Sequence, residues 1–215
     1  MNKEIGKYLM IAGILLCSLS CSAIQNVELD KNNIRIVNRE FIPTKDYESN
    51  IISLNAQKSS GLAIINNVEF ETGIIEFDVL GENNPGRSFV GIAFNIQNDS
   101  TYEAIYFRPF NFKSSEKIRR EHSMQYIFHP DFTWKRLRTE KEGQFESEFF
   151  NPPSPDDWFS IRVKINSERV IIEDQSSGER LMEVERLSST NSNKIGFWTG
   201  FGSKGSFRNL RIENK

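Results

Sequence analysis

The sequence predicts an all-β protein, built as an antiparallel two-sheet β-sandwich. From residue 33 onward, apolar residues recur at alternate positions in short runs that are separated by turn-forming residues. Aromatic residues make up 12% of the chain, with 17 Phe, and aromatic side chains favour strands. Roughly a dozen such runs, about 8–12 residues apart, are typical of a sandwich or barrel.

Alternation predicts six strands in the first half of the chain, over residues 33–37, 51–54, 62–65, 73–80, 89–97 and 101–108. Ile75, Phe77 and Val79 share one face of the fourth of these strands. Residues 98–100 form a turn, so the last two strands are expected to pair as a hairpin. The second half of the chain repeats the pattern over residues 158–165, 170–173, 181–184, 194–201 and 206–212.

Residues 109–157 interrupt this regular spacing. Five prolines fall in the segment, and residues 114–120 and 131–140 are predicted as short helices, capped by Ser114 and Asp131. A long excursion inside a compact β domain is usually functional. The segment is therefore expected to cap one end of a cleft.

The N-terminus is predicted to direct export. Residues 1–23 combine two lysines, an apolar stretch and small residues, which is typical of a signal peptide. The apolar stretch is shorter than the ~20 residues of a membrane-spanning helix. Ser18-Leu19-Ser20-Cys21 resembles a bacterial lipobox and predicts lipidation of Cys21, whereas Cys21-Ser22-Ala23 resembles an A-x-A cleavage site and predicts free release.

These two cleavage outcomes give two expected locations. Lipidation predicts an outer-membrane or cell-surface lipoprotein, which contacts the membrane only through its lipid anchor. Cleavage without lipidation predicts a periplasmic or secreted protein. In both cases residues 24–32 are expected to form a polar tether, and residues 33–215 a single sandwich domain.

Charge and cysteine content exclude several function classes. The chain has 27 basic and 29 acidic residues, and both cysteines lie in the signal region. No disulfide and no cysteine-based metal site is therefore expected in the domain. Basic residues cluster within 113–141, but acidic residues are interspersed among them, so nucleic acid is not an expected partner.

Four motifs occur in a characteristic order. A Gly-x-x-Glu-Phe-Asp strand at 73–78 precedes Phe-Val-Gly-Ile-Ala-Phe at 89–94; Lys-Ile-Gly-Phe-Trp at 194–198 precedes Phe-Arg-Asn-Leu-Arg-Ile at 207–212. This order resembles concanavalin A-like (LamG-type) β-sandwiches of jelly-roll architecture over residues 33–213. The resemblance is closest to exported bacterial domains similar to the 3-keto-disaccharide hydrolase-like family, and segments 102–112, 119–126 and 129–138 resemble one branch of that group. The resemblance implies the fold, but its superfamily contains lectins, glycosidases, lyases and adhesive modules.

A binding face is predicted on strand 101–108. Alternation directs Ile105 and Phe107 to the core, and Tyr106 and Arg108 to the other face. Aromatic rings stack on the C–H faces of sugars, and a guanidinium donates forked hydrogen bonds to hydroxyls. The predicted ligand-binding residues are Tyr106, Arg108, Trp198, Asn95, Gln97 and Gln125. The alternative is that segment 109–157 covers this face, which makes Tyr106 and Arg108 structural anchors.

Trp198 joins this set because it lies opposite Phe197 and Phe201, which are expected to face the core. Asn95 and Gln97 are expected on the non-core face of the strand that precedes 101–108. Gln125 is expected to add a further amide.

Candidate catalytic residues are few. Glu76 and Asp78 share a strand face, but retaining glycoside hydrolysis needs two carboxyls about 5–5.5 Å apart, and a solvated outer face explains both residues equally well. His129 is a candidate general base. His122 and His129 are expected on opposite faces of one strand, so they do not predict a metal site.

No cofactor is predicted. Glu82, Asn84 and Asp99 lie in turns and carry the oxygen ligands that calcium accepts, but their spacing is not diagnostic.

The sequence thus predicts an exported protein that binds a carbohydrate or glycoside on the concave face of one sheet. One alternative is an enzyme that hydrolyses glycosides, including 3-keto glycosides, which time-dependent product formation would reveal. The second is an envelope protein-interaction module, which would capture a stable partner and ignore sugars.

Overall fold

The computed structural model describes residues 23–43 and 50–215. The predicted signal peptide up to residue 22, including Cys21, lies outside the described residues. Within these ranges, no helix combines the length and the apolar character that crossing a bilayer requires.

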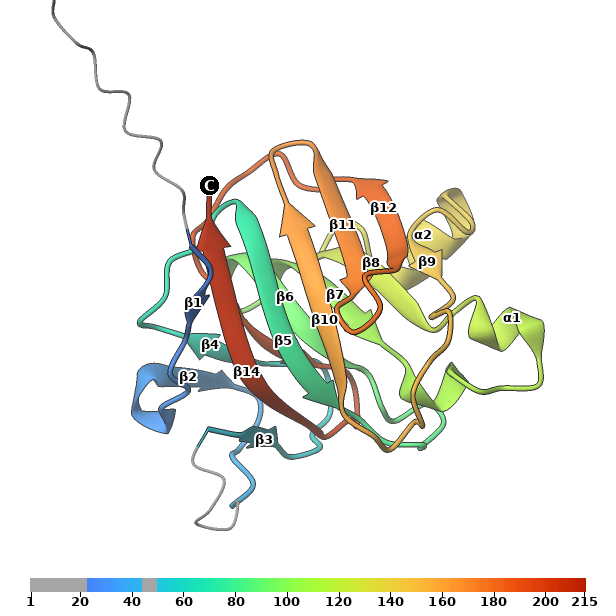
Figure 1. Cartoon of the computed structure of the whole chain (residues 1–215), viewed down its shortest axis with the longest axis horizontal. Coiled ribbons are helices and arrows are strands. Elements are labelled where there is room, and N and C mark those ends of the chain that lie inside the picture. The colour runs from blue at the N-terminus through green and yellow to red at the C-terminus, as the bar shows by residue number, and fades with distance from the viewer. Residues whose placement is uncertain (1–22, 44–49) are drawn as a thin grey trace, which may run out of the picture.

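Two seven-stranded antiparallel sheets pack face to face (Figure 1). The first sheet has the order β1-β14-β5-β10-β11-β12, and β3 also pairs with β14. Its strands are β1 (Gln25–Asn26), β3 (Ile52–Leu54), β5 (Gly73–Leu80), β10 (Phe159–Ile165), β11 (Arg169–Asp174), β12 (Arg180–Glu185) and β14 (Gly205–Asn214).

The second sheet has the order β2-β4-β13-β6-β7-β8-β9. Its strands are β2 (Ile34–Val37), β4 (Gly61–Ile65), β6 (Val90–Asn98), β7 (Thr101–Phe107), β8 (Met124–His129), β9 (Glu146–Ser147) and β13 (Gly196–Thr199). The predicted all-β, two-sheet architecture is therefore confirmed. The remaining elements are short helices: η1 (Lys31–Asn33), η2 (Pro109–Asn111), α1 (Lys117–Arg120) and α2 (Trp134–Glu140).

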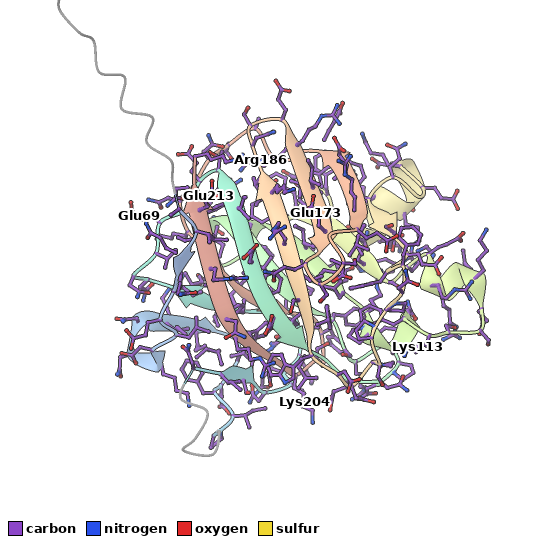
Figure 2. All side chains as sticks on the ribbon, in the orientation of Figure 1. Glu69, Lys113, Glu173, Arg186, Lys204 and Glu213 are labelled. Carbon is purple, nitrogen blue, oxygen red and sulfur yellow. The ribbon has the colours of Figure 1, made fainter. Side chains whose placement is uncertain are left out.

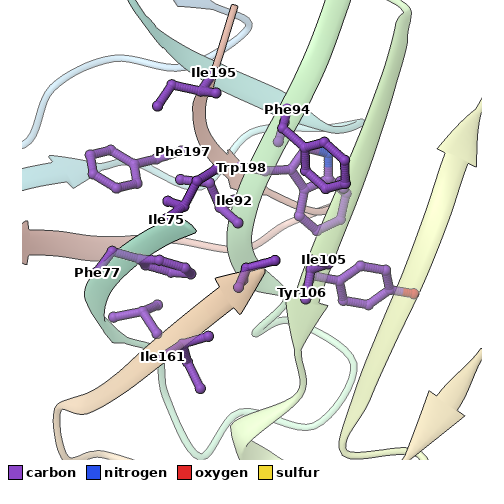
Figure 3. Close-up of a cluster of buried hydrophobic side chains, with 14 of the residues drawn as sticks. Ile75, Phe77, Ile92, Phe94, Ile105, Tyr106, Ile161, Ile195, Phe197 and Trp198 are labelled. Carbon is purple, nitrogen blue, oxygen red and sulfur yellow. The ribbon is translucent and has the colours of Figure 1, made fainter. Parts of the chain in front are cut away.

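The core lies between the two sheets, where alternate residues of facing strands meet. Ile75 and Phe77 of β5 lie close to Phe197 of the second sheet (Figure 3), and the Phe77 and Phe197 ring centroids are 6.4 Å apart. Phe197 also stacks on Phe207 of β14 at 4.5 Å. Ile75, Phe77 and Val79 of β5, predicted to share one face, and Ile105 and Phe107 of β7, predicted to face the core, are all buried.

A buried ion pair also joins the two layers. Glu103 of β7 accepts a hydrogen bond from Arg186, which follows β12, at 3.0 Å. Both side chains are almost fully buried, and the Tyr126 hydroxyl donates to the same carboxylate. This network fixes β7 and β8 relative to the far edge of the first sheet.

The segment 24–32, predicted as a polar tether, is instead part of the sandwich. Gln25 and Asn26 pair with Ile212 and Arg211 of β14, and Leu29 is only 2% exposed. The segment packs because Val27 and Leu29 are two residues apart and therefore bury on the same side.

Both short helices begin later than predicted. Thr133, and not Asp131, caps α2 by accepting a hydrogen bond from the Arg136 N–H. The α1 helix starts at Lys117, and Ser114 instead accepts from the Glu116 N–H in the turn before it. These turns place α1 and α2 beside β8 and β9 at one edge of the second sheet (Figure 1).

Candidate functional site

A cavity of about 560 Å³ lies on the outer face of the second sheet. Strands β7, β8 and β13 supply its floor, and segment 109–157 forms a wall. The lining residues are Ser60, Gly86, Phe89, Tyr106, Arg108, Phe110, Asn111, Arg119, His122, Ile127, His129, Trp134, Arg138, Trp198, Gly200 and Phe201. Segment 109–157 therefore borders this face and leaves it hollow.

An aromatic wall of four rings runs along the cavity. Trp198 and Tyr106 stack with ring centroids 4.8 Å apart, Phe89 lies 6.0 Å from Tyr106, and Phe110 lies 5.6 Å from Phe89. Gly91 stands in register between Trp198 and Tyr106, so no side chain separates the two stacked rings. Trp198 Nε1 donates to the Tyr102 hydroxyl at 3.1 Å, which holds the indole in place.

Arg108 follows β7 at the end of this wall and is 5% exposed. Its Nη2 donates to the Tyr106 hydroxyl at 2.8 Å and to Gln125 Oε1 at 2.5 Å. Its Nη1 donates to the His122 carbonyl at 2.9 Å and to Glu146 Oε1 at 3.0 Å. Arg108 thus connects β7 to segment 109–157 through its hydrogen bonds, and it also lines the cavity.

Glu146 is a buried carboxylate shared by two guanidiniums. Pairing of β9 with β8 sets Glu146 beside Gln125, where Arg138 donates through Nε at 2.9 Å and through Nη2 at 2.5 Å. Burial acts to raise the pKa of Glu146, but the hydrogen bonds from Arg138 and the charges of Arg108 and Arg138 outweigh it and hold that pKa below its ordinary value. Glu146 is therefore ionised at neutral pH.

Both histidines line the same cavity, so their predicted placement on opposite faces is wrong. His122 lies in the turn between α1 and β8, where strand alternation does not apply. Its Nδ1 is 3.2 Å from Glu146 Oε2, without the alignment of a hydrogen bond. Burial lowers the pKa of His122, against the opposing charge of Glu146, and burial also lowers the pKa of His129.

Three of the six predicted binding residues, Tyr106, Arg108 and Trp198, meet in the cavity. Gln125 is fully buried behind Arg108. Asn95 and Gln97 lie elsewhere. A bulge in β6 between Phe94 and Asn98 breaks the alternation.

As a result of the bulge, the Asn95 amide turns inward and donates to Glu103 at 2.6 Å. Gln97 is exposed and donates to Thr190 Oγ1. Phe201, predicted to face the core, is 58% exposed at the cavity, because β13 ends at Thr199 and the chain turns there.

Glu76 and Asp78 lie on the outer face of the first sheet, away from the cavity. Glu76 pairs with Arg162 at 2.6 Å and with Arg211 at 2.7 Å. Asp78 accepts from Ser160 at 2.6 Å and from Arg208 at 3.1 Å. Figure 2 looks onto this face, where Glu173 is labelled among the same charged side chains.

The turn residues considered for calcium have other partners. Glu82 pairs with Lys204 and Asp99 with Arg35, each at 2.7 Å, and the Asn84 carbonyl accepts from the Arg87 N–H. Within residues 23–43 and 50–215, no cluster of three or more His, Cys, Asp or Glu side chains could hold a metal ion.

Sequence reasoning missed Glu146, Arg138, His122 and Trp134 as members of one site. One signal was available: Trp134 and Arg138 are four residues apart in a predicted helix, and the Arg138 guanidinium lies 5.3 Å over the Trp134 ring. Glu146 carried no such signal, because its place follows from the pairing of the two-residue strand β9.

Comparison with known proteins gives a fold and no family. No sequence-family model matches, and no curated protein matches. Among solved structures, carbohydrate-binding module CBM66 from Bacillus subtilis aligns with a TM-score of 0.58 at 10% identity, covering 84% of this chain and 95% of that one. This protein has a concanavalin A-like β-sandwich fold.

Two further solved structures share this fold. The exoplasmic domain of VIP36, solved with calcium and Man3GlcNAc bound, aligns with a TM-score of 0.54 at 11% identity, covering 85% of this chain and 84% of that one. A Parabacteroides distasonis protein, provisionally assigned as a glycosyl hydrolase, aligns at 0.53 with 13% identity, covering 86% and 90%. At these identities the concanavalin A-like fold is shared, and function must be argued from the cavity.

Proposed function

We propose that this protein is exported and binds a carbohydrate in the cavity on the outer face of its second sheet. The observation that carries the proposal is the aromatic wall formed by Trp198, Tyr106, Phe89 and Phe110, with the Arg108 guanidinium at its end, in a cavity of about 560 Å³. Cavities of roughly 300–1,000 Å³ with apolar walls and a few fixed polar groups are typical of small-molecule sites.

Two rings are available at the mouth of the cavity for stacking on a sugar. Trp134 on α2 is 46% exposed and Phe201 is 58% exposed, although both line the cavity. An exposed aromatic ring beside fixed polar groups matches a saccharide, which presents both apolar C–H faces and hydroxyls. The proposal is supported by the fold that this chain shares with carbohydrate-binding module CBM66 and with the VIP36 domain solved with Man3GlcNAc bound.

The membrane part of the proposal rests on the sequence. The lipobox-like Ser18-Leu19-Ser20-Cys21 favours a lipid anchor on Cys21 at the outer membrane or cell surface. Radiolabelled palmitate should enter the wild-type protein and not the Cys21→Ala variant. If neither the wild-type protein nor the variant incorporates palmitate, the protein is not lipidated, and the periplasmic or secreted form is favoured instead.

Thermal unfolding against a panel of oligosaccharides tests binding. At a ligand concentration of 100 Kd, the free energy of unfolding should rise by about 2.7 kcal/mol. Trp134→Ala should weaken binding by about two- to tenfold, whereas Phe150→Ala is a matched control, since Phe150 is 44% exposed and does not line the cavity. No shift with any saccharide would refute the proposal and favour the envelope protein-interaction function.

A second candidate, a glycoside hydrolase, is favoured by the close approach of His122 to Glu146. A histidine beside a carboxylate can act as a general base, and the His122 side chain lines the cavity. The two-carboxylate mechanism has less support, because none of the described residues lining the cavity is Asp or Glu. Product formation that is lost in His122→Gln while saccharide binding persists would establish the enzyme; binding without turnover would exclude it.

A further inference from the structure

The cavity is cationic, although the chain as a whole is slightly acidic. Its lining contains three arginines and two histidines, and none of its described lining residues is acidic, whereas the whole chain has a formal net charge of −2. The hollows on the outer face of the first sheet are lined by both signs, with Glu76, Asp78 and Glu213 against Arg162, Lys164 and Arg211. The excess positive charge is therefore a local property of the cavity.

The excess originates at Glu146. In segment 109–157, the described ion pairs otherwise join one cation to one carboxylate: Lys117–Glu121, Arg119–Glu116, Arg120–Glu148 and Arg136–Glu140. Among the described ion pairs of this segment, Glu146 is the one carboxylate that two guanidiniums share, those of Arg108 and Arg138. The buried cluster thus carries a net charge of +1 even when His122 is neutral.

The two guanidiniums differ in how many hydrogen-bond donors remain available to a ligand. Arg108 is almost fully buried, and its Nη1 and Nη2 each donate to two protein acceptors. The Arg138 side chain is 35% exposed, and its hydrogen bonds through Nε and Nη2 all go to Glu146. Its third nitrogen, Nη1, makes no hydrogen bond among the described residues, so it remains available at the cavity surface.

We propose that the ligand of this cavity is an acidic saccharide, whose anionic substituent pairs with Arg138 beside the aromatic wall. This inference rests on the proposed carbohydrate binding and adds the charge class of the ligand. Arg138 is held by Glu146 and by the Trp134 ring, so little side-chain entropy is lost when it binds an anion. A carboxylate or sulfate would balance the charge of the extra guanidinium.

The test compares each saccharide as an acid and as its neutral counterpart. Isothermal titration would use short oligomers of galacturonate, glucuronate and mannuronate, each as the free acid and as the methyl ester. A sulfated galactan oligomer and its desulfated form serve as a separate arm. We expect at least one acid to bind roughly ten- to a hundredfold more tightly than its neutral form, and its affinity to fall as salt is raised.

Arg138→Gln should abolish this preference, and the chain offers a matched control. Arg162 is 34% exposed and pairs with Glu76, while Arg138 is 35% exposed and pairs with Glu146; each carboxylate is 3% exposed. Arg162→Gln therefore removes an equivalent ion pair on the opposite face and should leave the preference intact. Should Arg138→Gln fail to fold, the comparison of acid with ester and the salt dependence of the wild-type protein still decide the question.

The outcomes separate this inference from the proposed function. Preference for a uronate or for the sulfated oligomer supports it and identifies the anion. Equal binding of acid and neutral forms overturns the inference but leaves carbohydrate binding standing. Absence of binding by every saccharide overturns both.

Discussion

Glu146→Gln tests whether the shared carboxylate holds the cavity together. The substitution leaves the Arg108 guanidinium buried without its counter-charge, and breaking a buried ion pair in this way costs about 3–5 kcal/mol. Arg108 keeps its hydrogen bonds to Tyr106, Gln125 and the His122 carbonyl, and Arg138 can reach solvent. The loss should therefore lie near the lower limit, about 3 kcal/mol.

For a chain of this size, a loss of about 3 kcal/mol lowers the melting temperature by roughly 6–12 °C. Urea unfolding of the variant would measure the loss directly, with Glu148→Gln as the control. Glu148 pairs with Arg120, and both side chains are partly exposed, so that change should cost less than about 1 kcal/mol. A loss below about 1 kcal/mol for Glu146→Gln would refute the view that this carboxylate stabilises the buried cluster.

Three further predictions concern the rest of the fold. Gly91→Ala should lower the free energy of unfolding by about 2–3 kcal/mol, because the added Cβ would lie 2.0 Å from the Ile105 carbonyl oxygen. An unchanged midpoint in urea unfolding would contradict this. Leu29→Ala should lower the free energy of unfolding by about 2–5 kcal/mol, whereas Ile24→Ala, at an exposed position, should change it very little. Equally small losses for both variants would mean that residues 24–32 form a tether outside the sandwich, as the sequence predicted. The melting temperature should fall as the pH is lowered from 7.5 to 5.5. Burial lowers the pKa of both histidines in the folded protein, so below ~6.5 the unfolded chain takes up protons before the folded protein does, and unfolding becomes more favourable. In the His122→Gln/His129→Gln double variant, the melting temperature should depend less on pH over this range. A melting temperature of the wild-type protein that rises on acidification would contradict the lowered pKa values of the two histidines.

Strand alternation predicted the sheet side of the site well. Tyr106 and Arg108 were placed by their offset from Ile105 and Phe107, and Trp198 by its offset from Phe197. Their meeting follows from register, since β13, β6 and β7 align Trp198, Gly91 and Tyr106 in one row. Period-2 patterns carry this information because every strand in the row is regular at that point.

The failures occur where the backbone departs from a regular strand. A bulge in β6, with Asn95 at φ 50°, rotates that side chain into the core. The end of β13 exposes Phe201, and the turn before β8 brings His122 into the cavity. Each change is a local backbone choice that hydrophobic periodicity does not encode.

The sheet and segment 109–157 contribute different groups to the cavity. The neutral rings of Tyr106 and Trp198 come from the sheet, whose register the sandwich core fixes. All lining cations except Arg108 come from segment 109–157, and Arg108 itself is held by Glu146 of that segment. The sheet and segment 109–157 therefore both supply aromatic rings to the cavity, since Phe110 and Trp134 come from the segment, whereas the lining cations other than Arg108 come from the segment alone. If the proposed site is right, substitution of Arg138 should change which saccharide binds, whereas substitution of Trp134, from the same helix, should weaken the binding of acidic and neutral saccharides alike.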